Sequence, residues 1–543
     1  MGRIKGLFIL ILFWGLQLNA QDRYMVFFKD KQGTNFSLDN PIEFLSQRSI
    51  DRKSRNQIKI DSLDLPVSDE YVTQISSAGA DVFFTSRWMN AALVQMTEEV
   101  QKAVGDLAFV ENVEFIAPEA PLSRNQTSYQ IATNFKEVSS TSGNSDDQLE
   151  QIGADHMHND GFTGEGKWIA VFDAGFPGVN EYEPFQHIHD ENRLVGTKDF
   201  IRNSGNVFQY HSHGSSVLSL IAADSKEGLK GSAPDASFLL CVTEDVSTEY
   251  RIEEYNWLLA AEYVDSAGAD VINSSVGYSD FDDENMNYSY SDMDGRTSVI
   301  AQAATLASDK GIVVVTSAGN YGNNSWYYIT TPADAPRVLS IGSVEIDGTK
   351  ASHSSFGPTY DGRVKPDVCA LGYGSTIFSY SSGSGKITKG NGTSYASPLI
   401  AGFAACVWQV FPEQSSQEIV QVVRRSGSNY ENPSDSLGYG VANYSRISDE
   451  DLIITSSLME SNIEVYPNPF HGEHININFN ETINGKIEIK LLDVHGKVLF
   501  DQKYRGLDLP GILQIEIDAP VNGMYFLTLR SREFNKTIKL IKE

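Results

Sequence analysis

Four polar residues, Asp173, His213, Asn320 and Ser394, are of the types that carry out acyl transfer. A serine hydroxyl becomes an effective nucleophile only when a base removes its proton, and a histidine can do this near neutral pH. An aspartate can hold the imidazole in the correct tautomer, and an asparagine amide can donate a hydrogen bond to a developing oxyanion. The set therefore suffices for nucleophilic hydrolysis, provided that the fold brings its members together.

The candidate nucleophile lies in the stretch GNGTSYASPLIAGF, residues 390–403. Gly390 and Gly392 allow a sharp turn, and the apolar run from Ala396 onward predicts a buried helix. We expect Pro398 to lie in the first turn of that helix, where its missing N–H costs little. Ser394 would then face the free N–H groups at the helix start, although a simple N-cap role remains an alternative interpretation.

The other three residues fall where a strand ends or a helix begins. Asp173 ends the apolar run KWIAVFD, Asn320 ends IVVVTSAGN, and His213 opens HGSSVLSLIAA. Chemistry in an open α/β sheet gathers at the carboxyl ends of strands. Taken singly, these residues would be a cap, a turn residue and a structural histidine. Their joint placement favours one site.

The elements that must position these residues alternate along the central part of the chain. The expected strands are near-continuous apolar runs, which indicates a sheet covered on both faces. This alternation predicts a doubly wound parallel α/β sheet. The expected strands are 167–173, 236–243, 269–277 and 312–320, and the expected helices are 213–223, 251–268 and 296–311.

Three flanking regions have a different character. Residues 1–20 combine two basic residues, an apolar run and a final small residue, which predicts a secretory signal peptide. Residues from about 22 to 120 predict an α+β unit, with strands RYMVFF and AALVQM and a helix TEEVQKAVGDL, and a polar linker follows from Arg124. After about Ser445, alternating strands predict an all-β sandwich.

The composition excludes some classes of function. The chain of 543 residues has 42 basic and 71 acidic residues, a net charge of −29, so we expect no nucleic-acid partner. Its three cysteines all lie in apolar stretches, which predicts buried free thiols rather than disulfides or a cysteine nucleophile. They are Cys241, Cys369 and Cys406.

The central region resembles the subtilisin-like serine proteases (subtilases) over residues 147–447. The likeness is carried by VFDAGF, HGSSVLSLIAA, TSAGN and GTSYASPLIAG, in the family order Asp, His, Ser. The resemblance implies a catalytic triad of Asp173, His213 and Ser394, with Asn320 in the oxyanion hole. Two departures are Ser216, which takes the place of a usual second histidine, and Tyr395, which takes the place of a frequent methionine.

The resemblance also implies a substrate-binding surface. Within NSSVG, Ser275, Val276 and Gly277 match the wall of the first specificity pocket, and Gly319 and Tyr321 flank the oxyanion asparagine. A substrate peptide would add there as a strand.

The family's usual calcium loop is absent from the resemblance, because DSKEGLK occupies that stretch. The acidic segment FDDENMNYSYSDMDG could bind calcium, but it lacks a full motif and is better interpreted as a solvated loop. No cofactor is therefore expected to be required, while structural calcium stays open.

The flanking regions resemble known accessory domains. SRWMNAALVQMTEEVQKAVGDLAFVENVEFIAP is similar to the subtilase propeptide, an inhibitor and chaperone, and FLSQRSIDRKSRNQI is more weakly similar to segments of related secreted proteases. YPNPF, GMYFLTL and KTIKLIKE resemble the type IX secretion sorting domain of Bacteroidetes. The alternatives are an unrelated binding domain at the amino end and a carbohydrate-binding or stabilising module at the carboxyl end.

These observations predict a secreted serine endopeptidase made as a zymogen, either extracellular or attached to the outer-membrane surface. The expected parts are a signal peptide (1–20), a propeptide with linker (21–146), a peptidase domain (147–447) and a sorting domain (458–543). Its partners would be polypeptide substrates, its own propeptide and the type IX secretion machinery. The alternatives are a non-peptidase serine hydrolase and a catalytically inactive surface-binding protein.

Overall fold

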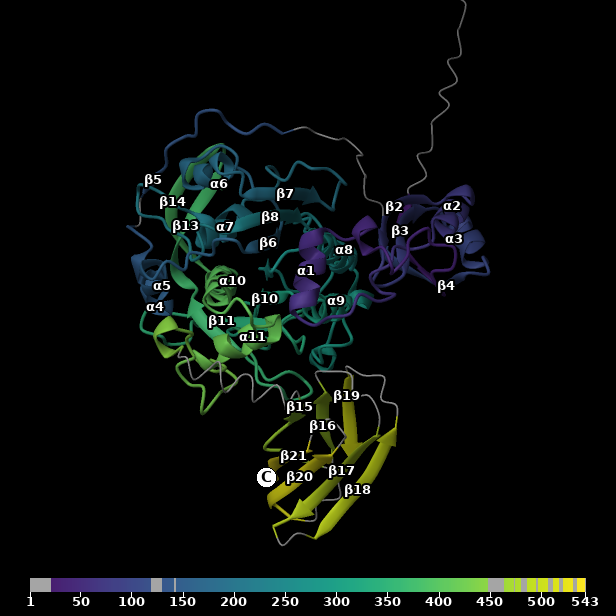
Figure 1. The fold of residues 1–543 in the computed structure, drawn as a ribbon. Helices are drawn as coiled ribbons and strands as arrows, with labels where there is room; N and C mark the ends of the chain where they lie inside the picture. The colour runs from purple at the N-terminus through teal and green to yellow at the C-terminus, as the bar shows by residue number, and fades with distance from the viewer. Residues whose placement is uncertain are drawn as a thin grey trace, which may run out of the picture. The chain divides into compact units, whose positions relative to one another are not determined.

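The structure is a computed structural model that describes ten stretches of the chain. They are residues 21–118, 129–140, 143–447, 463–472, 474–479, 486–494, 497–505, 511–516, 521–530 and 535–542. The expected signal peptide lies outside the described residues, as does the start of the expected linker. The chain forms two compact units, one of Met1–Asn35 with Pro66–Pro121 and the other of Phe36–Leu65 with Leu122–Glu543 (Figure 1).

The first unit is a four-stranded antiparallel sheet with two helices. The strand order is β2-β3-β1-β4, and the helices α2 and α3 pack their apolar faces on the sheet around Ile75, Val94 and Val104. The strands and the helix expected from the sequence in this unit are confirmed. The elements are β1 (Asp22–Phe28), α2 (Asp69–Ser77), β2 (Asp81–Ser86), β3 (Ala91–Met96), α3 (Glu98–Gly105) and β4 (Val110–Ala117).

A seven-stranded sheet forms the centre of the second unit. Its order is β12-β11-β10-β9-β6-β8-β7, and every neighbouring pair is parallel. The predicted parallel α/β sheet is confirmed. The strands are β6 (Trp168–Asp173), β7 (Leu194–Asp199), β8 (Ser237–Val242), β9 (Val271–Ser274), β10 (Val313–Ser317), β11 (Leu339–Val344) and β12 (Val368–Leu371).

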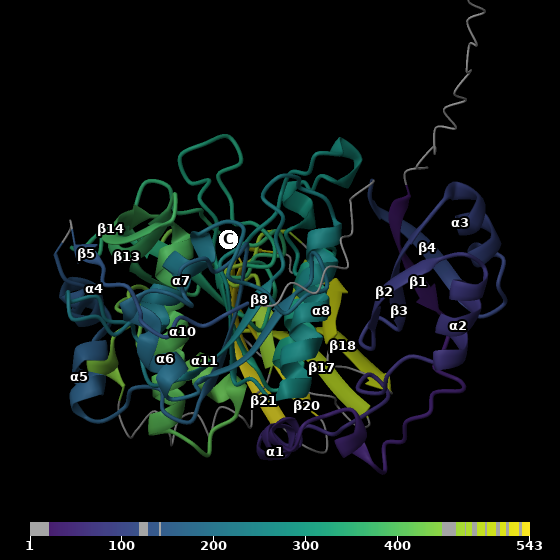
Figure 2. The same ribbon diagram turned by 90° about the horizontal axis from the view of Figure 1, so that it is seen from above.

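Helices cover both faces of this sheet. Figure 2 shows α7 and α10 on one side of the sheet and α8 on the other, and α9 packs against α8. The core on the α7 and α10 face joins apolar side chains of these helices to those of the strands. The helices are α7 (His213–Ala222), α8 (Ile252–Ala267), α9 (Val299–Asp309), α10 (Thr393–Val410) and α11 (Ser416–Arg425).

Smaller elements complete the second unit. A hairpin of β13 (Tyr373–Ser381) and β14 (Ser384–Asn391) pairs with β5 (Ser139–Ser140). Most of residues 129–140 are exposed, as expected of the linker, and backbone pairing at β5 holds the end of this stretch. Three short helices are α4 (Asp146–Ile152), α5 (Ala154–Asn159) and α6 (Gln186–Asp190). A further helix, α1 (Gln47–Arg55), comes from the amino-terminal segment that belongs to this unit.

The C-terminal region consists of two antiparallel sheets that share one apolar core. The sheet orders are β15-β16-β19 and β18-β17-β20-β21, and side chains from both sheets enter the core. This arrangement agrees with the expected sandwich. The strands are β15 (Ile463–Tyr466), β16 (His474–Phe479), β17 (Lys486–Asp493), β18 (Val498–Arg505), β19 (Gly511–Glu516), β20 (Gly523–Arg530) and β21 (Asn535–Lys542).

The state of the cysteines agrees with the expectation from the sequence. Cys241, Cys369 and Cys406 are free and buried, as predicted, and burial raises the pKa of each thiol. Among the helices of the described residues, none is long and apolar enough to span a bilayer.

Candidate active site

Asp173 and His213 form an ion-pair geometry at the carboxyl end of β6. Asp173 is the last residue of that strand, and His213 is the first residue of α7. His213 Nδ1 lies 2.9 Å from each carboxylate oxygen of Asp173, so Nδ1 carries a proton and donates a hydrogen bond to the carboxylate. The Asp173 side chain is 1% exposed and the His213 side chain 27% exposed, which leaves the imidazole edge open to solvent.

Two glycines allow this close approach. A β-carbon on Gly214 would lie 2.5 Å from the Gly175 carbonyl oxygen and 2.8 Å from the Asp173 β-carbon. Gly175 has φ +140°, and a β-carbon there would lie 2.2 Å from the Gln209 carbonyl oxygen. The close packing of Asp173 and His213 therefore requires glycine at both Gly214 and Gly175.

Ser394 is the second residue of α10 and is buried. The expectation that Pro398 lies in the first turn is wrong, because α10 begins at Thr393 and Pro398 is its sixth residue. Since proline has no N–H, it cannot donate to the carbonyl group four residues earlier, which is that of Ser394. Ser275 Oγ donates to this carbonyl oxygen instead, at 3.0 Å.

A short polar relay ties the serine to the neighbouring strand. Asn273 Nδ2 donates to Ser275 Oγ at 3.1 Å, and Ser397 Oγ donates to Asn273 Oδ1 at 2.9 Å. These groups are all buried, so each would lose stability without its partner. The relay fixes the first turns of α10 to β9 and so holds the Ser394 backbone in place.

The Asn320 side chain is oriented by Thr393. Its Oδ1 accepts hydrogen bonds from Thr393 N at 2.9 Å and Thr393 Oγ1 at 3.1 Å, which leaves Nδ2 free to donate elsewhere. A β-carbon on Gly392 would lie 2.9 Å from Ser394 Oγ and 3.8 Å from Asn320 Nδ2. The hydroxyl and the amide donor therefore border the same small space beside Gly392, which a side chain there would fill.

The charges of the site act mainly on His213. Burial of the ring lowers the pKa of His213, but the Asp173 carboxylate more than offsets this effect, and Glu244 acts in the same direction as Asp173. The net pKa of His213 is raised. The Tyr395 ring lies 5.8 Å from the His213 ring between centroids, so the residue after the serine also borders the imidazole.

The residues expected to bind substrate lie beside this centre. Ser275, Val276 and Gly277 directly follow β9, and Gly319 and Tyr321 flank Asn320 beyond the end of β10. A β-carbon on Gly277 would lie 2.4 Å from Thr330 Oγ1, and one on Gly319 would lie 3.0 Å from the same atom. The Thr330 side chain thus lies between the two segments.

Thr330, Thr393, Asn273 and Ser397 were not identified from the sequence. The Thr330 hydroxyl is buried and has no hydrogen-bond partner among the described residues, which is unusual for a structural threonine. No motif marks Thr330, because its position depends on the packing of a loop against two glycines. Thr393 and Ser397 lie within the quoted serine stretch, and the helical spacing from Ser394 could have drawn attention to them.

A comparison with protein families is decisive. The family described as "Subtilase family" matches residues 164–440, about half of the chain. The chain belongs to the subtilase family. The resemblance seen in its motifs is therefore confirmed. Two further matches are a "Peptidase S8 propeptide domain, Bacteroidota" over residues 23–132 and a "Secretion system C-terminal sorting domain" over residues 464–543.

Curated subtilases are similar over the catalytic region. Subtilisin DY of Bacillus licheniformis is 30% identical over 292 residues, which cover 53% of this subtilase and 92% of the relative. Subtilisin NAT of Bacillus subtilis subsp. natto is 29% identical over 277 residues, covering 50% of this chain and 63% of the relative, which is less than two thirds of its length. Among solved structures, MycP1 from Mycobacterium smegmatis has a TM-score of 0.45 and 21% identity, covering 59% of this chain and 88% of that one.

The sorting domain bears on where this subtilase acts. The C-terminal match and the subtilase relatives indicate a protein that is secreted or attached to the outer surface. The propeptide match agrees with the expected zymogen organisation.

The acidic segment considered for calcium uses its carboxylates locally. Asp283 Oδ1 accepts from Asn285 N at 3.0 Å, and Asp292 Oδ2 accepts from Ser289 N at 2.7 Å. In the described part of the chain, no group of three or more His, Cys, Asp or Glu side chains is arranged to hold a metal ion.

Proposed function

We propose that this subtilase is a serine endopeptidase that hydrolyses peptide bonds through an acyl-enzyme intermediate, with Ser394 as nucleophile, His213 as base and Asp173 as the orienting acid. The observation that carries the proposal is the convergence of Ser394 Oγ and Asn320 Nδ2 on one space, while the His213 ring, held by a buried carboxylate, lies beside Tyr395, the residue after the serine. We further propose that it needs no organic cofactor.

In the first step, His213 Nε2 accepts the Ser394 hydroxyl proton as Oγ attacks the carbonyl carbon of the substrate. The carbonyl π-electrons move to oxygen, and the resulting oxyanion accepts a hydrogen bond from Asn320 Nδ2 and from the Ser394 backbone N–H. Asp173 stabilises the imidazolium without taking its proton. Collapse of the intermediate breaks the C–N bond, and His213 returns the proton to the leaving amine.

In the second step, water replaces the amine. His213 Nε2 accepts a water proton as the water oxygen attacks the ester carbonyl of the acyl-enzyme. Collapse of this second intermediate breaks the bond to Ser394 Oγ, and His213 returns the proton to that oxygen. The carboxylic acid leaves, and the free enzyme is restored.

The position of Thr330 bears on substrate preference. Its side chain lies between Gly277 and Gly319, where the resemblance places the first specificity pocket. A threonine there takes up volume that a smaller residue would leave to the substrate. We therefore assign Thr330 the role of limiting the size of the substrate side chain that precedes the cleaved bond.

A fluorophosphonate probe tests the nucleophile directly, because it labels only an activated serine. We expect stoichiometric labelling of processed wild-type protein, with the labelled peptide containing Ser394, and no labelling of Ser394→Ala. The exposed Ser381→Ala is the matched control and should label like wild type. A folded wild-type protein that takes up no label would overturn the proposal in favour of an inactive surface-binding protein.

The non-peptidase alternative requires a second assay. Parallel measurements on a protein substrate and on a simple ester distinguish a peptidase from an esterase. We expect hydrolysis of both, with cleavage of the protein abolished in Ser394→Ala. Ester hydrolysis without any peptide cleavage would favour the other serine hydrolase class.

A further inference from the structure

Residues 36–65 interrupt the first unit but belong to the second. They lie in the chain between β1 and α2, two neighbouring elements of the propeptide match, yet they pack with the catalytic unit. None of the four strands of the first unit comes from this segment, which we call the strap. The strap contains α1, whose residues Ser49, Arg52 and Lys53 are fully buried.

The surface that receives the strap is the carboxyl end of α8. The last carbonyl groups of a helix have no partners within the helix, and they carry the negative end of its dipole. A cation is favourable at this position, yet α8 has no basic residue in its last turn and instead has the buried acid Asp265. The helix therefore requires positive charge from elsewhere in the chain.

The strap supplies that charge. Arg52 pairs with the Asp265 carboxylate and donates to the carbonyl oxygens of Asp265 and Ala269. Arg48 Nε donates to the Gly268 carbonyl oxygen at 2.9 Å, and its guanidinium pairs with Asp270. Both arginines thus neutralise a carboxylate and satisfy a carbonyl group of the same helix end.

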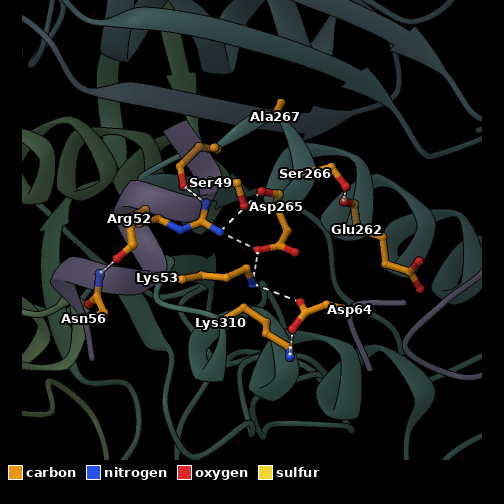
Figure 3. Close-up of polar contacts among 12 residues, drawn as sticks. Ser49, Arg52, Lys53, Asn56, Asp64, Glu262, Asp265, Ser266, Ala267 and Lys310 are labelled. Carbon is orange, nitrogen blue, oxygen red and sulfur yellow. Dashed lines mark hydrogen bonds and ion pairs between the residues drawn. The ribbon is translucent and has the colours of Figure 1, made fainter. Parts of the chain in front are cut away.

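Further ion pairs alternate between residues of the strap and residues of the catalytic unit (Figure 3). Lys53 Nζ lies 3.0 Å from Asp265 and 3.1 Å from Asp64, and Lys310 Nζ lies 3.0 Å from Asp64 and 3.1 Å from Asp61. Burial alone would raise the pKa of Asp64, but Lys53 and Lys310 outweigh it and lower that pKa. The strap therefore both gives cations to the catalytic unit and takes one from it.

Backbone contacts confirm a tight fit. Ser46 N and Ser46 Oγ donate to the carbonyl oxygens of Ser266 and Ala267, each at 2.9 Å. A β-carbon on Gly268, which has φ +97°, would lie 2.8 Å from the Ser49 nitrogen. At the other end of α1, Asn56 Oδ1 accepts a hydrogen bond from Ser416 N, at the start of α11, at 2.7 Å.

The strap lies far from the active site. Its contacts fall just before β6, β9 and β10, at Gly166, Asp270 and Lys310, whereas the catalytic groups follow the opposite ends of strands. The Arg48 guanidinium stacks on Trp168, the first residue of β6, at 4.6 Å, and Asp173 is the last. At about 3.3 Å per residue these two ends of β6 are about 16 Å apart. The strap therefore binds the catalytic unit without blocking the active site.

We propose that the strap is the anchor that keeps the propeptide bound to the catalytic unit after the chain between them has been cut. The partner of the α8 end is thus residues 36–65 of the same chain, and anchoring is physically separate from inhibition. If the chain is processed as a zymogen, as proposed above, this anchor delays the appearance of activity after cleavage. Only this consequence rests on the proposed function.

The test removes self-cleavage from the question. A recognition sequence for an outside protease is inserted between residues 118 and 129 of full-length Ser394→Ala, and the purified protein is cut. The dissociation constant of the amino-terminal piece is then measured for the parent chain, for Arg52→Met/Lys53→Met and for Lys102→Met. The last is the matched control, because Lys102 forms an exposed ion pair within the first unit.

We expect the double variant to bind at least about 100-fold more weakly than the parent, since it removes both of the strap cations that pair with the buried Asp265. Lys102→Met should bind like the parent. Equal affinity of the double variant and the parent would overturn the proposal, whether or not the protein is a protease.

A second variant covers the case in which the double variant fails to fold. Arg48→Ala is the milder change, because the Arg48 side chain is 31% exposed and its buried partner Asp270 keeps a hydrogen bond from Trp168 N at 2.9 Å. We expect its uncut form to fold, as judged by circular dichroism, and its cut form to bind about tenfold more weakly. A folded Arg48→Ala with parental affinity would count against the anchor.

Discussion

The carboxyl ends and the amino ends of the parallel strands lie at opposite edges of the seven-stranded sheet, which we call the carboxyl edge and the amino edge. Acidic and basic side chains meet at both, but they pair differently. At the carboxyl edge, Asp173 pairs with a single partly exposed histidine, whose second nitrogen stays available. At the amino edge, Asp265 pairs with two buried cations, Arg52 and Lys53. The same three strands, β6, β9 and β10, border both places.

The two arrangements suit different roles, proton transfer at the carboxyl edge and binding of the strap at the amino edge. A pair that is left incomplete, with a partner that titrates near neutral pH, can move a proton. A pair that is buried and shared among permanent charges cannot, but it is costly to break from one side. Changes at the carboxyl edge should therefore alter turnover, and changes at the amino edge should alter association.

The sharpest test of this contrast is removal of the nucleophile. Ser394→Ala should reduce kcat by about 10⁶-fold, the magnitude that loss of this serine has in subtilisin, without lowering the melting temperature appreciably. The variant should also accumulate as a precursor with the propeptide attached. Processing equal to that of wild type, in a host that lacks other proteases, would contradict self-maturation.

The next effect in size concerns Asn320. Because the oxyanion exists only in the transition state and the intermediates, Asn320→Ala should lower kcat by about 10²–10³-fold while KM stays nearly constant, a range known from subtilisin. The measurement is kcat per active site titrated with a covalent inhibitor. Asn323→Ala, an exposed neighbour, is the control. A change of less than about threefold would leave Asn320 as a turn residue only.

A smaller effect is expected at Thr330. Thr330→Ala removes a hydroxyl and a methyl group between Gly277 and Gly319, so larger substrate side chains should gain about tenfold or more in kcat/KM relative to small ones. Profiling on a peptide mixture measures the ratio, and the exposed Thr349→Ala serves as control. An unchanged ratio would remove Thr330 from the specificity-determining residues.

The smallest effect is the pH dependence. Since Asp173 raises the pKa of His213 above the ordinary value of 6.5, kcat/KM should rise with pH through an inflection above 6.5. The sign for stability is opposite: the ion pair stabilises the fold below pH 6.5, and that contribution is lost as pH rises through the folded pKa. At the amino edge, the lowered pKa of Asp64 keeps its charge at neutral pH, and burial lowers the pKa of Lys53, so strap affinity should fall only towards alkaline pH and should not follow the titration of His213. A kcat/KM that does not change with pH would contradict the contrast between the two edges. A strap affinity that changes with pH in parallel with kcat/KM would contradict it as well.

Local patterns were enough to predict the strands and helices that carry the chemistry. The apolar run ending at Asp173 and the one before Asn320 are β6 and β10, and the helix expected from His213 is α7. Such runs are long, buried and bounded by glycine or polar residues, so the signal lies within the segment itself. Local patterns could not predict that the four site residues belong to one site, because these residues are far apart in sequence. That prediction depended on the family resemblance.

Other features depend on contacts that no local pattern contains. β7 has a half-buried sequence without a continuous apolar run, LVGTKD, and it pairs with β8 as an outermost strand of the finished sheet. The position of Pro398 within α10 is tolerated because Ser275, more than a hundred residues earlier, satisfies the Ser394 carbonyl group. Likewise, the basic residues of α1 indicate a solvated helix by composition, whereas distant acids allow them to be buried.

The strap also constrains the order in which the molecule can fold. Arg52 and Asp265 are separated by 213 positions, so closing that loop costs about 5 kcal/mol of chain entropy before any contact forms. The first unit closes shorter loops, because the most distant partners in its sheet, Arg23 and Ala117, are 94 positions apart. Docking of α1 should therefore come late, once α8 has ended and β9 has joined the sheet. An occupied strap site would then mark a catalytic unit whose folding is complete.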